Sequence, residues 1–139
     1  MTVVARLAAL LVLAALAACS TGVGTRPDAL ERTLYEYSGA IRWNSFEVAW
    51  DMVDPEVRKA RPLTEFELER LKQVQITRYD VVASLPLPDG RIAREVELGV
   101  VNRHTQAERV VRVRETWRYD EVAQRWWQTE GLPDLSPAR

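Results

Sequence analysis

The sequence is poor in the side chains that form disulfides or bind metals. Of its 139 residues, one is cysteine and one is histidine. A lone cysteine has no partner within the chain for a disulfide, and one cysteine with one histidine is too small a set for a structural zinc site. We therefore expect no metal and no cofactor, and a domain that is held together by burial of apolar side chains.

An excess of one charge sign is also lacking, as are long apolar runs. The chain has 19 basic and 20 acidic residues, for a formal net charge of −1. A nucleic-acid-binding surface needs clustered lysine or arginine, so this balance argues against one. The longest apolar run, residues 7–18, is shorter than the about 20 residues that a membrane-spanning helix requires.

That apolar run has the features of a secretory signal. Arg6 precedes it, small residues close it, and the sequence Leu16-Ala17-Ala18-Cys19 follows directly. This stretch resembles a bacterial lipobox, which ends in a cysteine because the modification requires a nucleophilic sulfur. We therefore predict a lipoprotein signal peptide over residues 1–18 and lipidation at Cys19. The alternative is an ordinary cleaved signal with a chance cysteine, which would yield a soluble secreted protein with one free thiol.

The resemblance to lipoprotein precursors implies the rest of the anchoring chemistry. The thiol of Cys19 receives a diacylglycerol, the chain is cut before Cys19, and the new amine receives a fatty acyl group such as palmitate. Two or more acyl chains make membrane attachment stable where one is reversible. Ser20 implies export to the outer membrane, where aspartate would imply retention at the inner one. We expect a protein anchored in the cell outer membrane and facing the periplasm.

The remaining chain has the length of one domain. We expect a lipidated tether over residues 19–27, a single α+β domain over residues 28–135, and a tail over residues 136–139.

Helices are predicted in the first half of this domain. Apolar residues recur at helical spacing, and capping residues mark where the helices begin. The expected helices are residues 29–42 after an Asp28 cap, residues 45–52 after an Asn44–Glu47 capping box, and residues 65–72 after a Thr64–Glu67 capping box. Asp54-Pro55 either ends the second helix or caps a short turn through Lys59.

The second half alternates with period two, which predicts strands. Four are expected: residues 74–85 with a bulge, 92–100, 111–119 and 125–129, with the fold ending at Leu132-Pro133. In the third strand, one face is expected to carry Val111, Val113, Glu115, Trp117 and Tyr119, and the other Arg112, Arg114, Thr116 and Arg118. The predicted architecture is α+β, with N-terminal helices packed on a curved antiparallel four-stranded sheet.

Three features of this pattern resemble the nuclear transport factor 2-like superfamily. They are the order of the helices, the segment from Arg42 to Trp50, and a final hairpin from Arg114-Glu115-Thr116-Trp117 into Trp126-Trp127. More narrowly, the chain is similar to proteobacterial envelope lipoproteins of that shape. The resemblance implies a cone in which a curved sheet wraps a cavity, used in different members for catalysis, small-molecule binding or dimerisation.

Aromatic and charged residues of the domain form the candidate site. Its members are Trp43, Trp50, Arg114, Glu115, Trp117, Tyr119 and Trp127. Large aromatic side chains line apolar pockets, but they are also the ordinary core of a small domain without disulfides. The sequence is compatible with both a ligand pocket and an ordinary core. The arginines at positions 112, 114 and 118 either bind an anionic ligand or partner, or pair across strands with Glu95 and Glu97.

Few residues are candidates for acid–base catalysis. Glu115 on the apolar face and Asp80 beside Tyr79 are the best placed, because burial would raise a carboxyl pKa. The structural alternative is a buried Glu115 paired with an arginine such as Arg42. His104 lies in a predicted polar turn, which favours a solvated side chain.

These observations predict a non-enzymatic interaction module that binds another envelope protein or a second copy of itself. One alternative is a binding protein for a small apolar ligand held in the cone. A further alternative is an isomerase- or hydratase-like enzyme with a buried carboxylate base.

Overall fold

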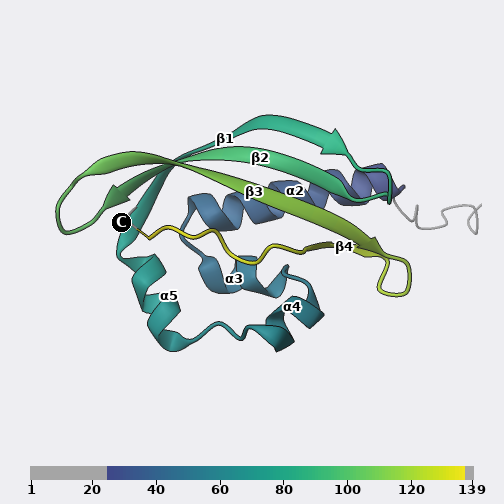
Figure 1. Cartoon of the computed structure of the whole chain (residues 1–139), viewed down its shortest axis with the longest axis horizontal. Helices are drawn as coiled ribbons and strands as arrows, with labels where there is room; N and C mark the ends of the chain where they lie inside the picture. The colour runs from purple at the N-terminus through teal and green to yellow at the C-terminus, as the bar shows by residue number, and fades with distance from the viewer. Residues whose placement is uncertain (1–24, 137–139) are drawn as a thin grey trace, which may run out of the picture.

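The computed structural model describes residues 25–136 as a set of helices followed by a sheet (Figure 1). The predicted signal peptide and Cys19 lie outside the described residues. Within the described part, no helix is long and apolar enough to cross a membrane.

The first helix, α2, spans Arg26–Arg42 and begins earlier than Asp28 predicts. Its N-cap is Thr25, and Asp28 is the third helical residue of a reciprocal capping box with Thr25. Pro27 fits here because the first helical turn needs no backbone N–H donor at that position. Residues 26 and 27, assigned to a tether on composition, are therefore helical.

Three short helices follow: α3 (Phe46–Asp51), α4 (Pro55–Ala60) and α5 (Glu65–Lys72). Asp54 caps α4, its side chain accepting from the Glu56 N–H at 2.9 Å, so the Asp54-Pro55 pair begins a helical turn. The predicted capping box of Thr64 and Glu67 is confirmed at the start of α5.

The predicted Asn44–Glu47 capping box is wrong. Asn44 has a φ of 56°, and its side chain bonds the backbone of β1: Nδ2 donates to the Val74 carbonyl at 2.7 Å, and Oδ1 accepts from the Ile76 N–H at 3.2 Å. Asparagine tolerates the left-handed conformation better than most residues. The Asn44 side chain thus links the α2–α3 turn to the sheet and does not cap α3. The N-cap of α3 is Ser45.

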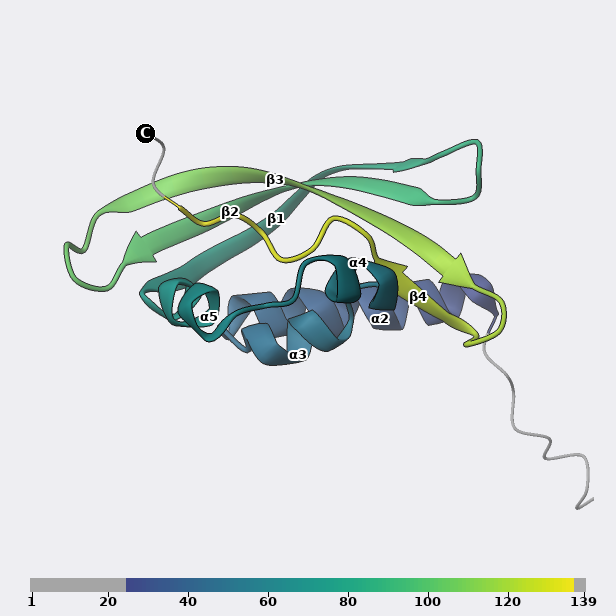
Figure 2. The ribbon, with the colours of Figure 1, turned by 60° about the horizontal axis from the view of Figure 1, so that its bottom comes forward.

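The strands are β1 (Val74–Pro86), β2 (Ile92–Asn102), β3 (Glu108–Asp120) and β4 (Arg125–Gln128). They form an open antiparallel sheet in the order β1-β2-β3-β4. Figure 2 shows the helices on one side of this sheet, which curves over them. The α+β architecture with four antiparallel strands is therefore confirmed.

The side of the sheet that faces the helices is called the inner face here. The register places Leu98 opposite Tyr79 on one neighbour and Val111 on the other, so these side chains share a face. The buried core lies between this face and the helices. It includes Tyr37, Ile41, Phe46, Ala49, Val96, Leu98, Val100 and Trp117. The predicted alternation of β3 is correct, with Val111, Val113 and Tyr119 packed against the core and Trp117 within it.

β1 forms one edge of the sheet and is irregular, as the sequence predicts. Its pairing with β2 shifts register between Ile76 and Arg78 and again between Val81 and Ala83. At the first shift, the extra residue Thr77 lies close to Gly99. A Cβ at position 99 would be 2.5 Å from the Thr77 hydroxyl oxygen. Any other residue at position 99 would force the Thr77 side chain to move.

The fold does not end at Leu132-Pro133. Residues 129–136, here called the C-terminal strap, continue from β4 between β3 and the short helices (Figures 1 and 2). Leu135 is a buried core residue and Leu132 packs against the same core. The strap is therefore part of the hydrophobic interior.

Candidate functional site

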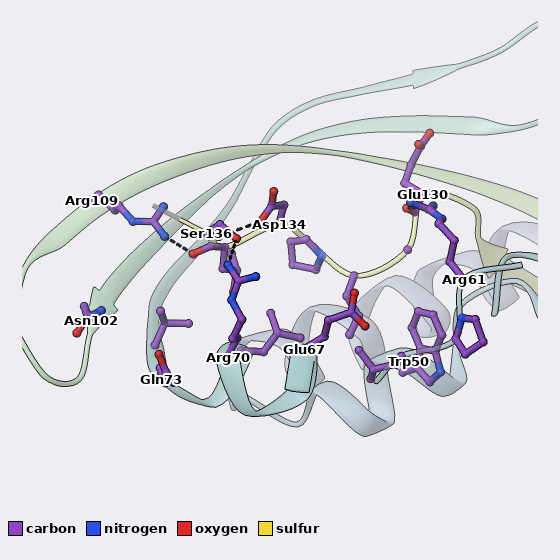
Figure 3. Close-up of a pocket in the computed structure, with 18 of the residues that line it drawn as sticks. Trp50, Arg61, Glu67, Arg70, Gln73, Asn102, Arg109, Glu130, Asp134 and Ser136 are labelled. Atoms are coloured by element: carbon purple, nitrogen blue, oxygen red, sulfur yellow. Dashed lines mark hydrogen bonds between the residues drawn. The ribbon is translucent and has the colours of Figure 1, made fainter. Parts of the chain in front are cut away.

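A cavity of about 710 Å³, here called the outer cavity, lies between the short helices, one end of the sheet and the C-terminal strap (Figure 3). Much of its wall is apolar: Trp50, Val57, Leu63, Leu71, Leu132 and Leu135. Three arginines and three carboxylates also line it, namely Arg61, Arg70, Arg109, Glu67, Glu130 and Asp134. An apolar hollow with a few polar groups is the usual form of a small-molecule site.

The three arginines hold the strap along one side of this cavity. Arg61 Nη2 donates to the Glu130 carbonyl at 3.3 Å, and Arg70 Nη2 donates to Ser136 Oγ at 2.6 Å. Arg109 Nη2 donates to the Leu135 carbonyl. Each acceptor is a neutral oxygen, so these contacts position the strap without neutralising the guanidinium charges.

Arg70 and Arg109 come from different elements and converge at one end of the cavity. Arg70 lies in the last turn of α5, and Arg109 lies near the start of β3. Arg109 pairs with the buried Val100, so its side chain lies on the inner face. Figure 3 shows both side chains directed at the end of the strap, Arg70 at Ser136 and Arg109 at the neighbouring Leu135 carbonyl. Arg61 lies toward the opposite end, beside Glu130.

The three carboxylates of the outer cavity accept hydrogen bonds from neutral donors. Glu67 Oε2 accepts from the Thr64 N–H at 2.9 Å and from the Thr64 hydroxyl at 2.7 Å. Glu130 Oε1 accepts from the Thr116 hydroxyl at 2.7 Å. Asp134 Oδ1 accepts from the Ser136 N–H at 2.9 Å, and hydrogen bonds from Ser136 hold the Asp134 pKa below its usual range.

A second hollow of about 340 Å³, here called the inner cavity, reaches the inner face of the sheet. Tyr37, Tyr79 and Glu115 line it, and residues 130–134 of the strap lie along both this cavity and the outer one. The strap therefore borders two hollows.

Glu115 forms a buried hydrogen-bonded cluster beside the inner cavity. Its Oε1 accepts from the Tyr79 hydroxyl, and its Oε2 accepts from Arg94 Nη1 at 3.3 Å and Trp117 Nε1 at 3.2 Å. Burial raises the Glu115 pKa, although the hydrogen bonds and the charge of Arg94 act against the shift. Burial and the Glu115 charge raise the pKa of Tyr79 above its usual range. The arrangement satisfies both carboxylate oxygens, which is the pattern of a structural ion pair.

The expected burial of Glu115 is correct, but Arg42 is not its partner. Arg94 is directly opposite Glu115 in the β2–β3 register. Asp80, the other acid–base candidate, is exposed and pairs with Arg78 at 2.8 Å. His104 is exposed in the turn between β2 and β3, as the sequence predicts.

The candidate aromatic residues do not form one site. Trp43 is 82% exposed at the end of α2 and lines neither cavity, so it is not a pocket residue. Trp50 lines the outer cavity. Trp117 is core and stands at 86° to Tyr37, with ring centroids 5.0 Å apart. Tyr119 packs against the core.

Trp127 lies on the other face of the sheet. It pairs with Arg118, and the Arg125 guanidinium carbon lies 4.0 Å from its ring centroid. On this outer face, the predicted cross-strand pairing holds for Arg112 and Glu97, which approach to 2.5 Å. Arg118 pairs with Asp54 and Asp120 instead. Arg114 is opposite Glu95 in register and borders the inner cavity.

Sequence reasoning missed the arginines of the outer cavity and the strap. The alternation of β3 could have identified Arg109. It predicts that odd-numbered residues from 111 to 119 face the helices, and position 109 continues that pattern. Arg61 and Arg70 lie on polar stretches with no such signal. Among residues 25–136, no group of three or more His, Cys, Asp and Glu side chains is arranged to hold a metal ion.

Comparison with known proteins supports the architecture alone. No protein-family model matches the chain, and neither does any curated protein. Among solved structures, the chain is similar to the crystal structure of a SEC-C motif containing protein from Psychrobacter arcticus, with a TM-score of 0.58 and 14% identity. The match covers 85% of this chain and 67% of that one. The chain thus shares an α+β fold with this protein.

Proposed function

We propose that this chain is a lipid-anchored protein of the bacterial outer membrane whose domain binds a small ligand in the outer cavity. The observation that carries the proposal is the cavity itself. Its volume of about 710 Å³ falls within the range of about 300–1,000 Å³ that is typical of ligand pockets. The apolar walls and the few convergent polar groups are what such a site requires.

The proposal includes a nuclear transport factor 2-like cone. Helices at the N-terminal end, a curved antiparallel sheet and cavities on the helix-facing side support this assignment. The lipobox-like sequence ending at Cys19 supports the anchor, and Ser20 supports the outer membrane. The domain would then face the periplasm and remain attached to the membrane through the lipid on Cys19.

Native mass spectrometry of the full chain tests ligand binding. The protein would be purified from an envelope fraction and released from detergent in the instrument. We expect an added mass of a few hundred daltons that is lost on denaturation. The variant Leu63→Trp tests whether the ligand occupies this cavity. It places a bulky side chain at the cavity wall and should abolish the added mass while the chain stays folded. A spectrum without added mass would contradict the proposal.

A second function, as an interaction module, is favoured by one specific observation. The second half of β1 is an edge of the sheet and is exposed, including the apolar Val81, Val82 and Leu85. Exposed apolar edge strands tend to pair with another strand. A second copy of this chain fits, because antiparallel pairing about Val82 would place Val81 opposite Ala83, and Leu85 opposite Tyr79, of the other copy.

The same spectrum tests this second function. A dimer that Val82→Lys dissociates would support it. Val122→Lys is the matched control, because Val122 is 96% exposed in the β3–β4 turn. A monomer would contradict pairing between copies, and a complex with a different envelope protein would assign the edge to that partner.

We do not infer an enzymatic role. The buried carboxylate of Glu115 is fully engaged by Tyr79, Arg94 and Trp117. This supports a structural function for Glu115 over an isomerase-type base.

A further inference from the structure

One end of the outer cavity has two arginines that no carboxylate of residues 25–136 contacts directly, although their charges help to lower the pKa of the nearby Asp134. Neither Arg70 nor Arg109 forms a salt bridge within residues 25–136. Their hydrogen bonds run to Ser136 Oγ and the Leu135 carbonyl. A guanidinium carries several N–H donors in one plane, so donors remain for a ligand on each side chain.

The carboxylates near this end already accept hydrogen bonds, each through one oxygen. Asp134 receives the Ser136 N–H, and Glu67 receives both donors of Thr64 as part of the α5 capping box. A ligand cation would be repelled by the two guanidinium charges at this end. A ligand anion would instead accept hydrogen bonds from the remaining guanidinium donors, and a charged acceptor forms stronger hydrogen bonds than a neutral one.

The apolar part of the cavity begins beside the same arginines. Leu71 follows Arg70 on α5, and Leu135 supplies the carbonyl that Arg109 binds. Arg70 is exposed at the rim, whereas Leu135 is buried. A ligand with a polar group at the rim and an apolar part deeper in the cavity would therefore contact polar side chains at one end and apolar side chains at the other.

We infer that the outer cavity binds an amphipathic anion, a small molecule with an apolar body and a carboxylate or phosphate head, and that Arg70 and Arg109 hold the head. This inference rests on the proposed ligand-binding function and names its ligand class. The head accepts hydrogen bonds from the guanidinium donors that the strap leaves free, and the body lies against Leu71 and Trp50.

Calorimetric titration of the full chain in zwitterionic nanodiscs tests this, with empty nanodiscs as the baseline. The probes are hexanoate, hexyl phosphate, hexanol and hexylammonium, which share one apolar body and differ in the head. We expect both anions to bind more tightly than hexanol, and hexylammonium to bind most weakly. The ratio of hexanoate to hexyl phosphate affinity identifies which anionic head the site prefers.

Variants separate a charge effect from a structural one. Arg70→Gln/Arg109→Gln should weaken hexanoate binding about tenfold or more, since a hydrogen bond to a charged group contributes at least that factor. Hexanol binding should be unchanged, and Arg70→Lys/Arg109→Lys should retain part of the preference for anions. Arg78→Gln is the control, because Arg78 is an exposed arginine outside both cavities.

Three results would overturn the inference. Equal affinity for hexanoate and hexanol would remove the anion preference while leaving ligand binding intact. A loss of hexanol binding in the double glutamine variant would show that the arginines act only by holding the strap. An added mass in the native spectrum without binding of either anion would reject this ligand class but not the proposed function.

Discussion

At the scale of single residues, the most constrained group is the ion pair of Glu115 and Arg94. Both side chains are less than a tenth exposed, and the β2–β3 register places them opposite each other. Removing two charges from water costs several kcal/mol per ion, which the mutual attraction and the added hydrogen bonds must offset. Tyr79 and Trp117 supply those hydrogen bonds.

Glu115→Gln should therefore be strongly destabilising, because it leaves Arg94 buried without a counter-charge. We expect a loss of about 3 kcal/mol in the free energy of unfolding, measured by urea denaturation. Glu115→Leu/Arg94→Met should recover most of that loss. Glu95→Gln is the control on the outer face and should change little. If Glu115→Gln costs no more than this control, the pair does not carry the stability assigned to it.

Asp54 and Arg118 form a second pair whose effect depends on pH. The hydrogen bond from Arg118 holds the Asp54 pKa below its usual range. The folded state therefore binds this proton less tightly than the unfolded state, and the pair stabilises fully above the ordinary aspartate pKa. This stabilisation disappears as the pH falls through the lowered, folded-state value.

Asp54→Asn should isolate that effect, because asparagine also caps a helix and keeps α4 intact. At pH 7 we expect a loss of about 1–2 kcal/mol, in the range of a charged hydrogen bond that is partly open to solvent. The difference from the wild-type chain should shrink as the pH falls below the usual aspartate pKa of about 3.9. A difference that is independent of pH between 3 and 7 would contradict the ion-pair explanation.

At the scale of elements, the C-terminal strap is a segment without helix or strand that nevertheless belongs to the core. Arginines from three places in the fold bind it: Arg61 after α4, Arg70 on α5 and Arg109 on β3. Leu135 is 5% exposed beneath these contacts. The strap thus links the short helices to the sheet and forms a wall of both cavities.

Leu135→Ala should destabilise the domain by about 2–5 kcal/mol, the usual cost of a large-to-small change in a core. Thermal and urea unfolding both measure it. Val122→Ala is the matched control, because Val122 is 96% exposed, and should have almost no effect. Equal stability of the two variants would mean that the strap is not packed in solution.

At the scale of the whole molecule, the proposed anchor places the domain at a membrane surface. The described domain has the first residue of α2 only seven positions after Cys19. A segment that short keeps the domain close to the bilayer once Cys19 carries lipid. The cavity would then be available to molecules at or near that surface.

Cys19→Ser should abolish lipidation, because serine lacks the nucleophilic thiolate. Intact mass and envelope fractionation measure the outcome: the variant should lack the acyl mass and leave the outer-membrane fraction. Ser20→Asp is the informative control, since we expect it to keep the lipid and to remain at the inner membrane. A Cys19→Ser chain that stays in the outer membrane would contradict lipid anchoring.

Much of the fold is predictable from local pattern. The helix α5 and its capping box, the bulged β1, and the inward residues of β3 all follow from spacing and residue type. The errors concern residues whose surroundings depend on the rest of the fold. Asn44 is of a residue type that often caps helices, but its side chain bonds to β1. Trp43 is exposed although its side chain is largely apolar.

Hydrophobic period and helix capping act within a few residues, so the α+β order of the elements and their inward faces can be predicted from the amino-acid sequence alone. The folded domain alone shows that Arg94 pairs with Glu115, that Arg70 and Arg109 both bind the strap, and that the strap enters the core. These contacts join residues far apart in the chain. Their partners depend on the exact strand register and on how the helices close over the sheet, and both are decided by the packing of the whole chain.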